Sequence, residues 1–392
     1  MGRIFLLVFT GLLIFGSTAL AQALTNDNAL ITITPSTRLT ILGGALNNGD
    51  LVNKGTLSLT GDWMNVDTYT PENGLFILNG TDRQNIAHNG QEVYQLLIAG
   101  EGEKVITSDM EIQDTLDLMD GVLTISNGIT LLVQANGTVV GGSDVSYIDG
   151  PLFHQGTGNK YFPVGSNGSF RPAELINVTG TNPVMGIATY QPNPDPTVPL
   201  ELLAVSDTRY WQLIHQSGVY DGTQIRLKVT NDERLGSDVD IQDVVVTSAD
   251  SIGGIFLNLG QSQFTGSLSD GQVTSSLPAF SEFYAIAVEG FAEERALFVP
   301  NALSPAALDP EDQVVKVYGQ QIVDEDFMFR IYNRWGQIVY ETNSFSEANT
   351  NGWHGETYSG DEEPIGVYHY TLTGTFASGK HFQRHGSIQV IR

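Results

Sequence analysis

Short runs of residues with high β propensity, separated by turn residues, cover the chain after residue 21. Apolar and polar side chains alternate, or nearly so, in residues 225–229 and 327–332, which is the pattern of a strand with one buried face. Residues 56–60 and 121–125 are similar short runs. After residue 21 no segment repeats apolar residues convincingly at the 3.6-residue period of an amphipathic helix. The pattern therefore predicts an all-β fold.

Glycine contributes 43 of the 392 residues, and much of it lies between these runs. Eight Asn-Gly and four Asp-Gly pairs are present, and such pairs tolerate the positive φ angles of tight strand reversals. Within residues 22–150, glycines that close apolar runs lie 19, 20, 21 and 20 positions apart, at Gly61, Gly80, Gly100, Gly121 and Gly141. A near-constant interval of this size predicts a β-solenoid of stacked rungs. An up-and-down antiparallel sheet is the alternative for this region.

A second region, residues 151–292, breaks the interval and is richer in proline. The stretch near 191–199 has proline at alternate positions. Because proline has no amide hydrogen, this stretch is predicted to be a linker or crossover outside any sheet. The strands that follow it predict an antiparallel β-sandwich of its own, separate from the solenoid, with Trp211 in the core.

The third region, residues 297–392, contains the clearest strands of the chain. Phe327, Phe329 and Ile331 are predicted to point to one face, and residues 333–337 are predicted to form a turn. The chain ends in a further strand-like run from residue 386.

Five sequence blocks follow one another in this third region. They are Val-Pro-Asn-Ala from residue 299, Phe-x-Ile-Tyr-Asn-Arg-Trp-Gly-Gln-x-Val-Tyr from 329, Gly-Trp-x-Gly from 352, Pro-x-Gly-Val-Tyr-x-Tyr from 364, and Gly-x-Ile-x-Val-Ile-Arg from 386. In this order they resemble the gliding motility-associated C-terminal domain, the type B sorting domain of the type IX secretion system of Gram-negative bacteria. The resemblance implies an Ig-like β-sandwich that carries the protein through the outer-membrane translocon, whose components are the implied partners. The matching signature residues are Pro300, Asn301, Asn333, Arg334, Trp335, Gly336, Trp353, Gly355, Pro364, Gly366, Tyr368, Tyr370, Gly386 and Arg392.

Some signature residues also have expected physical roles. Trp335 and Trp353 are expected in the core beside glycines. Arg334 is expected either to pair with an acid of the sandwich or to face the export machinery. If that machinery reads the domain, the exposed signature residues and Arg392 would make the contact, while the two tryptophans would only hold the shape of the domain. Residues 301–312 lack the glycine turns that typically follow this stretch in the family, so a calcium loop is not expected there.

Residues 1–21 have the organisation of a Sec signal peptide. Arg3 precedes an apolar run, and the small residues Ala19 and Ala21 precede the expected cleavage site. No later run of apolar residues is long enough to cross a membrane as a helix, so the mature form is predicted to have no transmembrane helix. The expected route leads to the periplasm and then to the outer-membrane surface or the medium.

Composition and the absence of known motifs exclude several classes of ligand and catalytic site. The formal net charge of −26 disfavours nucleic acid as a partner, and the absence of cysteine excludes disulfides, thiolate metal sites and thiol nucleophiles. The motifs of P-loops, dinucleotide sites, zinc proteases and serine hydrolases are missing, and the seven histidines are scattered. We therefore predict no catalytic residue, no cofactor and no metal site.

Two functions from different classes are compatible with these features. The favoured one is a non-enzymatic, adhesin-like surface protein with a glycan or cell-surface ligand, because segments between residues 61 and 165 resemble passengers often joined to this sorting domain. The alternative is a secreted polysaccharide lyase or hydrolase on a solenoid, using clustered carboxylates. Its candidate residues are Glu111, Asp114, Asp117 and Asp120. A second acidic run, residues 238–243, lacks the glycine of a calcium loop and is expected to be a solvated turn.

Overall fold

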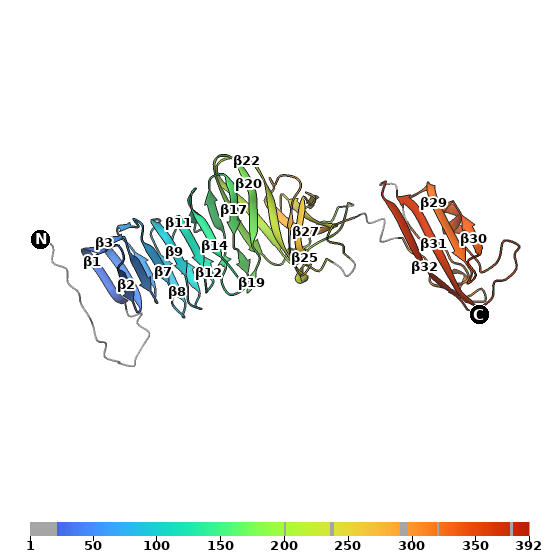
Figure 1. The fold of residues 1–392 in the computed structure, drawn as a ribbon, viewed down its shortest axis with the longest axis horizontal. Coiled ribbons are helices and arrows are strands. Elements are labelled where there is room, and N and C mark those ends of the chain that lie inside the picture. The colour runs from blue at the N-terminus through green and yellow to red at the C-terminus, as the bar shows by residue number, and fades with distance from the viewer. Residues whose placement is uncertain are drawn as a thin grey trace.

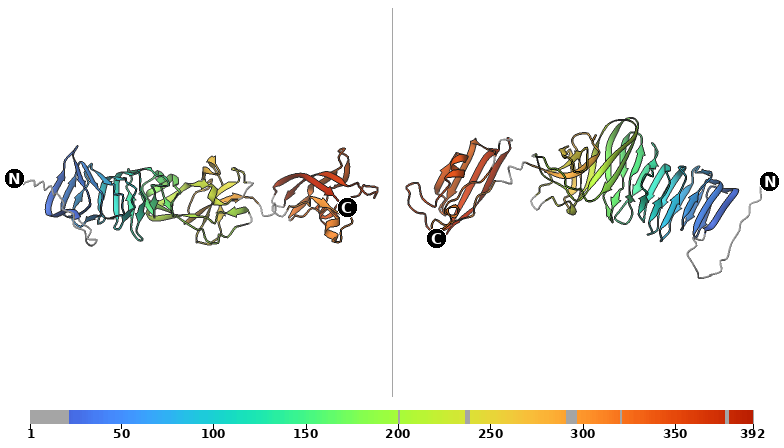
Figure 2. Two further views of the ribbon diagram at one scale, coloured as in Figure 1. Left: turned by 90° about the horizontal axis from the view of Figure 1, so that it is seen from below. Right: turned by 180° about the vertical axis from the view of Figure 1, so that it is seen from behind.

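A computed structural model of the chain describes residues 22–199, 201–235, 239–290, 297–319, 321–376 and 379–391. They form two units with separate main cores, which we call the rod (residues 22–290) and the C-terminal domain (residues 297–391). Figures 1 and 2 show the rod as an elongated stack of strands that begins at β1. Ala19, Ala21 and Arg392 lie outside the described residues. None of the helices in the described ranges is long and apolar enough to cross a membrane.

The first part of the rod, residues 22–155, is a β-solenoid with two parallel sheets. Lys104, for example, pairs in parallel with Gln84 of the preceding rung and with Leu123 of the following one. The predicted solenoid is confirmed, and the antiparallel alternative for residues 22–150 is wrong. The first sheet contains β1 (Gln22–Ile33), β3 (Gly44–Asn53), β5 (Trp63–Asn65), β6 (Tyr69–Thr70), β8 (Gln84–Ala87), β10 (Lys104–Ile106), β12 (Leu123–Ile125) and β15 (Ile148–Asp149). The second contains β2 (Arg38–Ile41), β4 (Thr56–Leu59), β7 (Leu75–Leu78), β9 (Glu92–Ile98), β11 (Met110–Leu118), β13 (Leu131–Val133), β14 (Thr138–Gly141) and β16 (Leu152–Gln155).

Ladders of apolar side chains fill the solenoid. Leu57, Phe76, Leu96 and Leu116 occupy matching positions in four successive rungs, and all are buried. Burial of one such side chain contributes about 1.5–3 kcal/mol. The rung-closing glycines are needed for close approach: a Cβ on Gly61 would lie 2.4 Å from the backbone of the preceding rung.

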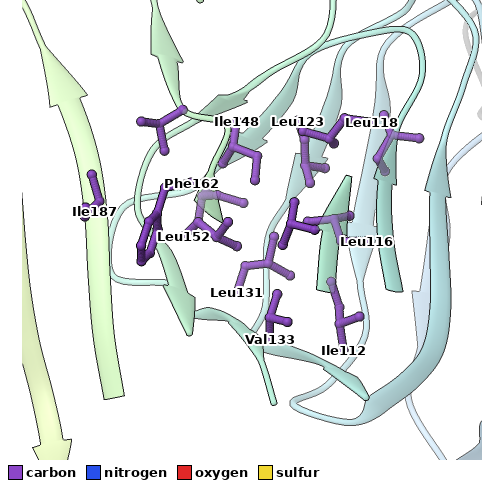
Figure 3. Packing of buried hydrophobic residues seen from close by; sticks show 14 of the residues in the cluster. Ile112, Leu116, Leu118, Leu123, Leu131, Val133, Ile148, Leu152, Phe162 and Ile187 are labelled. Atoms are coloured by element: carbon purple, nitrogen blue, oxygen red, sulfur yellow. The ribbon is translucent and has the colours of Figure 1, made fainter. Parts of the chain in front are cut away.

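The second part of the rod is antiparallel and shares its core with the solenoid, so the prediction of a sandwich of its own in this region is wrong. Strand β16 pairs in parallel with β13 and antiparallel with β20, so one sheet continues across residue 150. Figure 3 shows solenoid side chains and those of Phe162 and Ile187 in one cluster. Trp211 is buried as predicted, and residues 191–199 connect two strands without forming one. The elements are β17 (Gly158–Phe162), β18 (Gly165–Ser166), β19 (Ser169–Phe170), β20 (Ala173–Tyr190), β21 (Leu202–Val205), β22 (Tyr210–Thr230), η1 (Asn231–Glu233), β23 (Val244–Ala249), β24 (Leu257–Asn258), β25 (Gln263–Ser267), β26 (Asp270–Thr274) and β27 (Phe283–Glu289).

The C-terminal domain is a five-stranded sheet with the order β28-β32-β31-β29-β30. Phe327, Phe329 and Ile331 are buried on one face, as the alternation predicts. The buried face packs against one short helix and against segments joined by isolated bridges such as Val315–Trp353, so the second layer of the sandwich has no long strand among the described residues. The elements are β28 (Ala302–Leu303), η2 (Pro310–Gln313), β29 (Ile322–Tyr332), β30 (Ile338–Thr342), α2 (Phe345–Thr350), β31 (Gly366–Phe376) and β32 (His381–Val390).

Candidate functional site

The turn between β29 and β30 is fixed by a buried asparagine. Asn333 is 9% exposed, and its Oδ1 accepts hydrogen bonds from the amides of Trp335 (3.1 Å) and Gln337 (3.0 Å). Its Nδ2 donates to Oε1 of Gln337 (3.1 Å). Gly336 has φ +77°, a conformation that favours glycine. None of these bonds uses the side chains of the two residues at the tip, Arg334 and Trp335, so the turn presents them on a rigid support.

The side chain of Trp335 projects from this turn and is 68% exposed. The prediction that it fills the core is wrong, because the last buried position of β29 is Ile331 and the turn lies beyond it. The guanidinium carbon of Arg334 lies 4.4 Å from the centre of the indole ring, which is a cation–π contact. Within the described ranges Arg334 makes no ion pair with a carboxylate. We call these two residues the Arg334–Trp335 tip.

Trp353, by contrast, is the core residue that the sequence predicts. It is 2% exposed, its Nε1 donates to the carbonyl of Glu356 (2.8 Å), and its ring centre lies 5.1 Å from that of Tyr368. Gly355 has φ +79°, and a Cβ there would lie 2.9 Å from the side chain of Leu303. This pair of signature residues therefore shapes the core.

The remaining described signature residues hold the strands together. The carbonyls of Asn301 and Pro364 accept hydrogen bonds from the amide of Gln389 (2.9 Å) and the hydroxyl of Tyr368 (2.8 Å), respectively. Tyr370 is half-buried and packs over Gly386, where a Cβ would lie 2.6 Å from the ring. Two further signature residues, Pro300 and Gly366, lie just before β28 and at the start of β31.

The stretch 301–312 does not gather ligands for an ion. Asp309 Oδ1 accepts from the amide of Glu311 (3.0 Å) at the start of η2, and Glu311 in turn pairs with Lys316 (3.2 Å). Among the described residues, no group of three histidine, aspartate or glutamate side chains could hold a metal ion.

Comparison with protein families decides what the C-terminal domain is. Residues 297–390 match the family described as the CHU_C type IX secretion signal domain. This part of the chain is a type IX secretion signal domain. A domain of this family implies secretion by the type IX system to the cell surface or the extracellular space, and contact with that system. No curated protein matches the chain.

The type IX secretion signal domain offers two kinds of signature residue. Trp353, Gly355, Tyr368 and Gly386 are engaged inside the domain. The Arg334–Trp335 tip is exposed, and the hydrogen bonds from Asn333 that close its turn do not use the side chains of Arg334 and Trp335. Among these signature residues, the side chains of Arg334 and Trp335 are therefore the ones exposed to solvent on a turn.

The four carboxylates considered for the alternative function, a polysaccharide lyase or hydrolase, lie in the rod on β11 and just after it. Glu111 accepts a hydrogen bond from Nε2 of Gln134 (2.8 Å), and Asp114 accepts one from Nε2 of Gln95 (2.7 Å). These amides come from neighbouring rungs, so the two carboxylates form polar ladders along the sheet. Asp240 accepts from the amide of Gln242 (3.1 Å) in a turn, as expected for residues 238–243, while Asp238 lies outside the described residues.

Several polar residues buried in the rod were not predicted from sequence. The amides of Asn26, Asn47 and Asn65 form a ladder with two 2.7 Å hydrogen bonds. Nδ1 of His88 accepts from Nε1 of Trp63 (2.9 Å), and burial lowers the pKa of His88 to about 4. Nζ of Lys104 donates to three glycine carbonyls at 2.6–2.9 Å, and burial lowers its pKa to about 8. Most of their hydrogen-bond partners lie in other rungs, so the residues next to them in the sequence do not indicate that they are buried.

Proposed function

We propose that the rod is a non-enzymatic, adhesin-like passenger that the type IX system places on the cell surface or in the medium. The observation that carries this proposal is the order of the two units: a rod with its own continuous core precedes a type IX secretion signal domain with a separate core. A rod of stacked parallel rungs suits the display of an extended binding surface.

We further propose that the chain reaches the periplasm by the Sec route and loses residues 1–21 there. The polar-apolar-small order of these residues supports this step. N-terminal sequencing of the secreted protein tests it. The expected first residue is Gln22, and a secreted chain that keeps Met1 would contradict the proposal.

Within the signal domain, we propose that the Arg334–Trp335 tip is read by a protein of the translocon. Exposed tryptophan and arginine side chains are the types most enriched at the energetic centres of protein interfaces. The rigid Asn333 turn supports this role, because a preordered side chain loses little conformational entropy on binding.

Deletion of residues 297–392 tests the export step. The truncated chain should accumulate in the periplasm, because the rod retains its own core but lacks the signal domain. Cell fractionation and surface labelling with an antibody to the rod measure this. Normal surface display of the truncated protein would overturn the export role of the domain.

An assay for polysaccharide cleavage tests whether the passenger is an enzyme. The purified chain is incubated with acidic and neutral polysaccharides, alongside Asp114→Ala and Asp117→Ala variants. We expect no cleavage by any of the three proteins. Cleavage that disappears on either replacement would establish the enzyme and overturn the proposal.

A further inference from the structure

A cavity of about 380 Å³ lies in the rod beside a bulged part of β22. The pairing of β20 with β22 shifts register on both sides of Val184, close to the pair Met185–His215. Such bulges turn side chains away from the regular sheet and are frequent beside functional sites. Met185 and Leu213 contribute apolar walls from the two strands, and Phe280, Ser281 and Glu282 line the cavity from the loop before β27. The volume falls within the range of about 300–1,000 Å³ of ligand pockets.

Three rings form an aromatic wall in this cavity. The ring centres of Tyr220 and Phe280 lie 5.8 Å apart, and those of His215 and Tyr220 lie 5.9 Å apart. The Tyr220 hydroxyl donates to the carbonyl of Ala279, which ties β22 to the loop. Phe280 is nevertheless 65% exposed. Gly222 leaves room for its ring, since a Cβ there would lie 3.0 Å from Cζ of Phe280. A phenylalanine held in place but left open offers a flat apolar face to a ligand.

Polar groups at the same cavity can act as donors and acceptors. Nε2 of His215 faces the carbonyls of Ser217 (3.0 Å) and Gly218 (3.2 Å), so it carries the hydrogen, and Nδ1 of the neutral ring is an acceptor. The carboxylate of Glu282 accepts from Nε2 of Gln212 (2.6 Å), which orients it at the rim. A carboxylate has two oxygens that each accept more than one hydrogen bond, so Glu282 keeps acceptor capacity for a ligand.

We propose that this pocket binds one neutral sugar residue of a glycan, with the apolar C–H face of the ring on Phe280 and its hydroxyl groups donating to Glu282 and His215. This inference rests on the adhesin-like function and names its ligand class. An anionic sugar fits poorly, because Glu282 is the charged side chain of the lining and the chain carries a formal net charge of −26. A quaternary ammonium group donates no hydrogen bond, so it would leave Nδ1 of His215 unpaired and the remaining acceptor capacity of Glu282 unused.

The test uses the full purified chain and named probes. Saturation-transfer NMR and calorimetry are run with glucose, galactose, mannose, N-acetylglucosamine and their β-linked disaccharides, and with glucuronate and choline. The variants are Phe280→Ala, Glu282→Gln and, as a matched control, Phe298→Ala, which removes a phenylalanine of similar exposure (58%) from the other unit. We expect at least one neutral sugar to bind. Phe280→Ala should reduce the affinity about tenfold or more, as for loss of a central aromatic contact. Glu282→Gln should reduce the affinity by a smaller factor, and Phe298→Ala should leave it unchanged.

Three results would overturn the inference: no neutral sugar binds, choline binds in preference to the sugars, or Phe280→Ala leaves sugar binding unchanged. Circular dichroism of each variant checks that the fold is intact. Adhesion of cells that display the same variants separates the pocket from the wider function. Adhesion that survives Phe280→Ala, together with absence of sugar binding, refutes the pocket and leaves the adhesin role standing. Sugar binding without any adhesion refutes the adhesin role and supports the pocket.

Discussion

The rod and the C-terminal domain use their tryptophans differently. In the rod, Trp63 and Trp211 are at most 1% exposed, and each indole N–H donates to a partner at 2.9 Å. The C-terminal domain buries Trp353 in the same way but leaves Trp335 68% exposed. A buried tryptophan is explained by packing, whereas an exposed one on a rigid turn has no role in a core. Trp63, Trp211 and Trp353 therefore stabilise the fold, whereas Trp335 lies on its surface.

The largest effect is expected from Trp63→Ala. Trp63 packs edge-on against Tyr69 and Phe76 and donates to His88, so its loss leaves a cavity and an unpartnered imidazole nitrogen. The free energy of unfolding of the rod should fall by about 3–5 kcal/mol. Chemical denaturation of the full chain, followed separately for the two units by hydrogen exchange, measures this. An equal loss of protection in the C-terminal domain would show that the two units do not fold independently.

Acid should weaken the rod through His88. Burial lowers its pKa from 6.5 to about 4, so between these pH values the unfolded chain takes up a proton that the native rod does not. Stability therefore falls as the pH drops from about 6.5 to about 4, by up to about 3 kcal/mol from this group. The His88→Gln variant should show a shallower pH dependence over this window, whereas His354→Gln, on the surface of the other unit, should not. Identical pH profiles for His88→Gln and the wild type would contradict the burial argument.

Removal of the asparagine that holds the turn should cost less. Asn333→Ala loses two hydrogen bonds to backbone amides and one to Gln337, and we expect about 1–2 kcal/mol less stability in the C-terminal domain. Thermal unfolding of the full chain measures the change. A variant as stable as the wild type would mean that the turn keeps its shape without the asparagine.

The sequence predicted the regular parts of both units because their signals are local or periodic. The glycine interval reports the rung length, and the alternation at Phe327, Phe329 and Ile331 reports a buried face. Burial of His88 and Lys104 was missed, since each has a buried hydrogen-bond partner on another rung, Trp63 for His88 and Gly80 for Lys104. The core role expected for Trp335 was wrong although residues 333–337 form the predicted turn: the expectation followed the residue type, and a tryptophan at the tip of a turn is not buried by the strands beside it.

The smallest effect on stability is expected from Trp335→Ala. The side chain is largely in water and the hydrogen bonds of the turn come from Asn333, so the change should stay within about 0.5 kcal/mol. Tyr358→Ala is the matched control, as it removes an aromatic side chain that is 70% exposed in the same unit. Denaturant midpoints of both variants should coincide with that of the wild type. A clear loss for Trp335→Ala alone would return this residue to a structural role.

Surface display of these two variants tests the central claim most directly, namely that the C-terminal domain is read at the Arg334–Trp335 tip. Cells producing wild type, Trp335→Ala or Tyr358→Ala are fractionated, and the amount of rod at the surface, in the medium and in the periplasm is measured by immunoblot. We predict that Trp335→Ala accumulates in the periplasm although its stability is unchanged, and that Tyr358→Ala is exported like the wild type. Export of Trp335→Ala at the wild-type level would contradict the account.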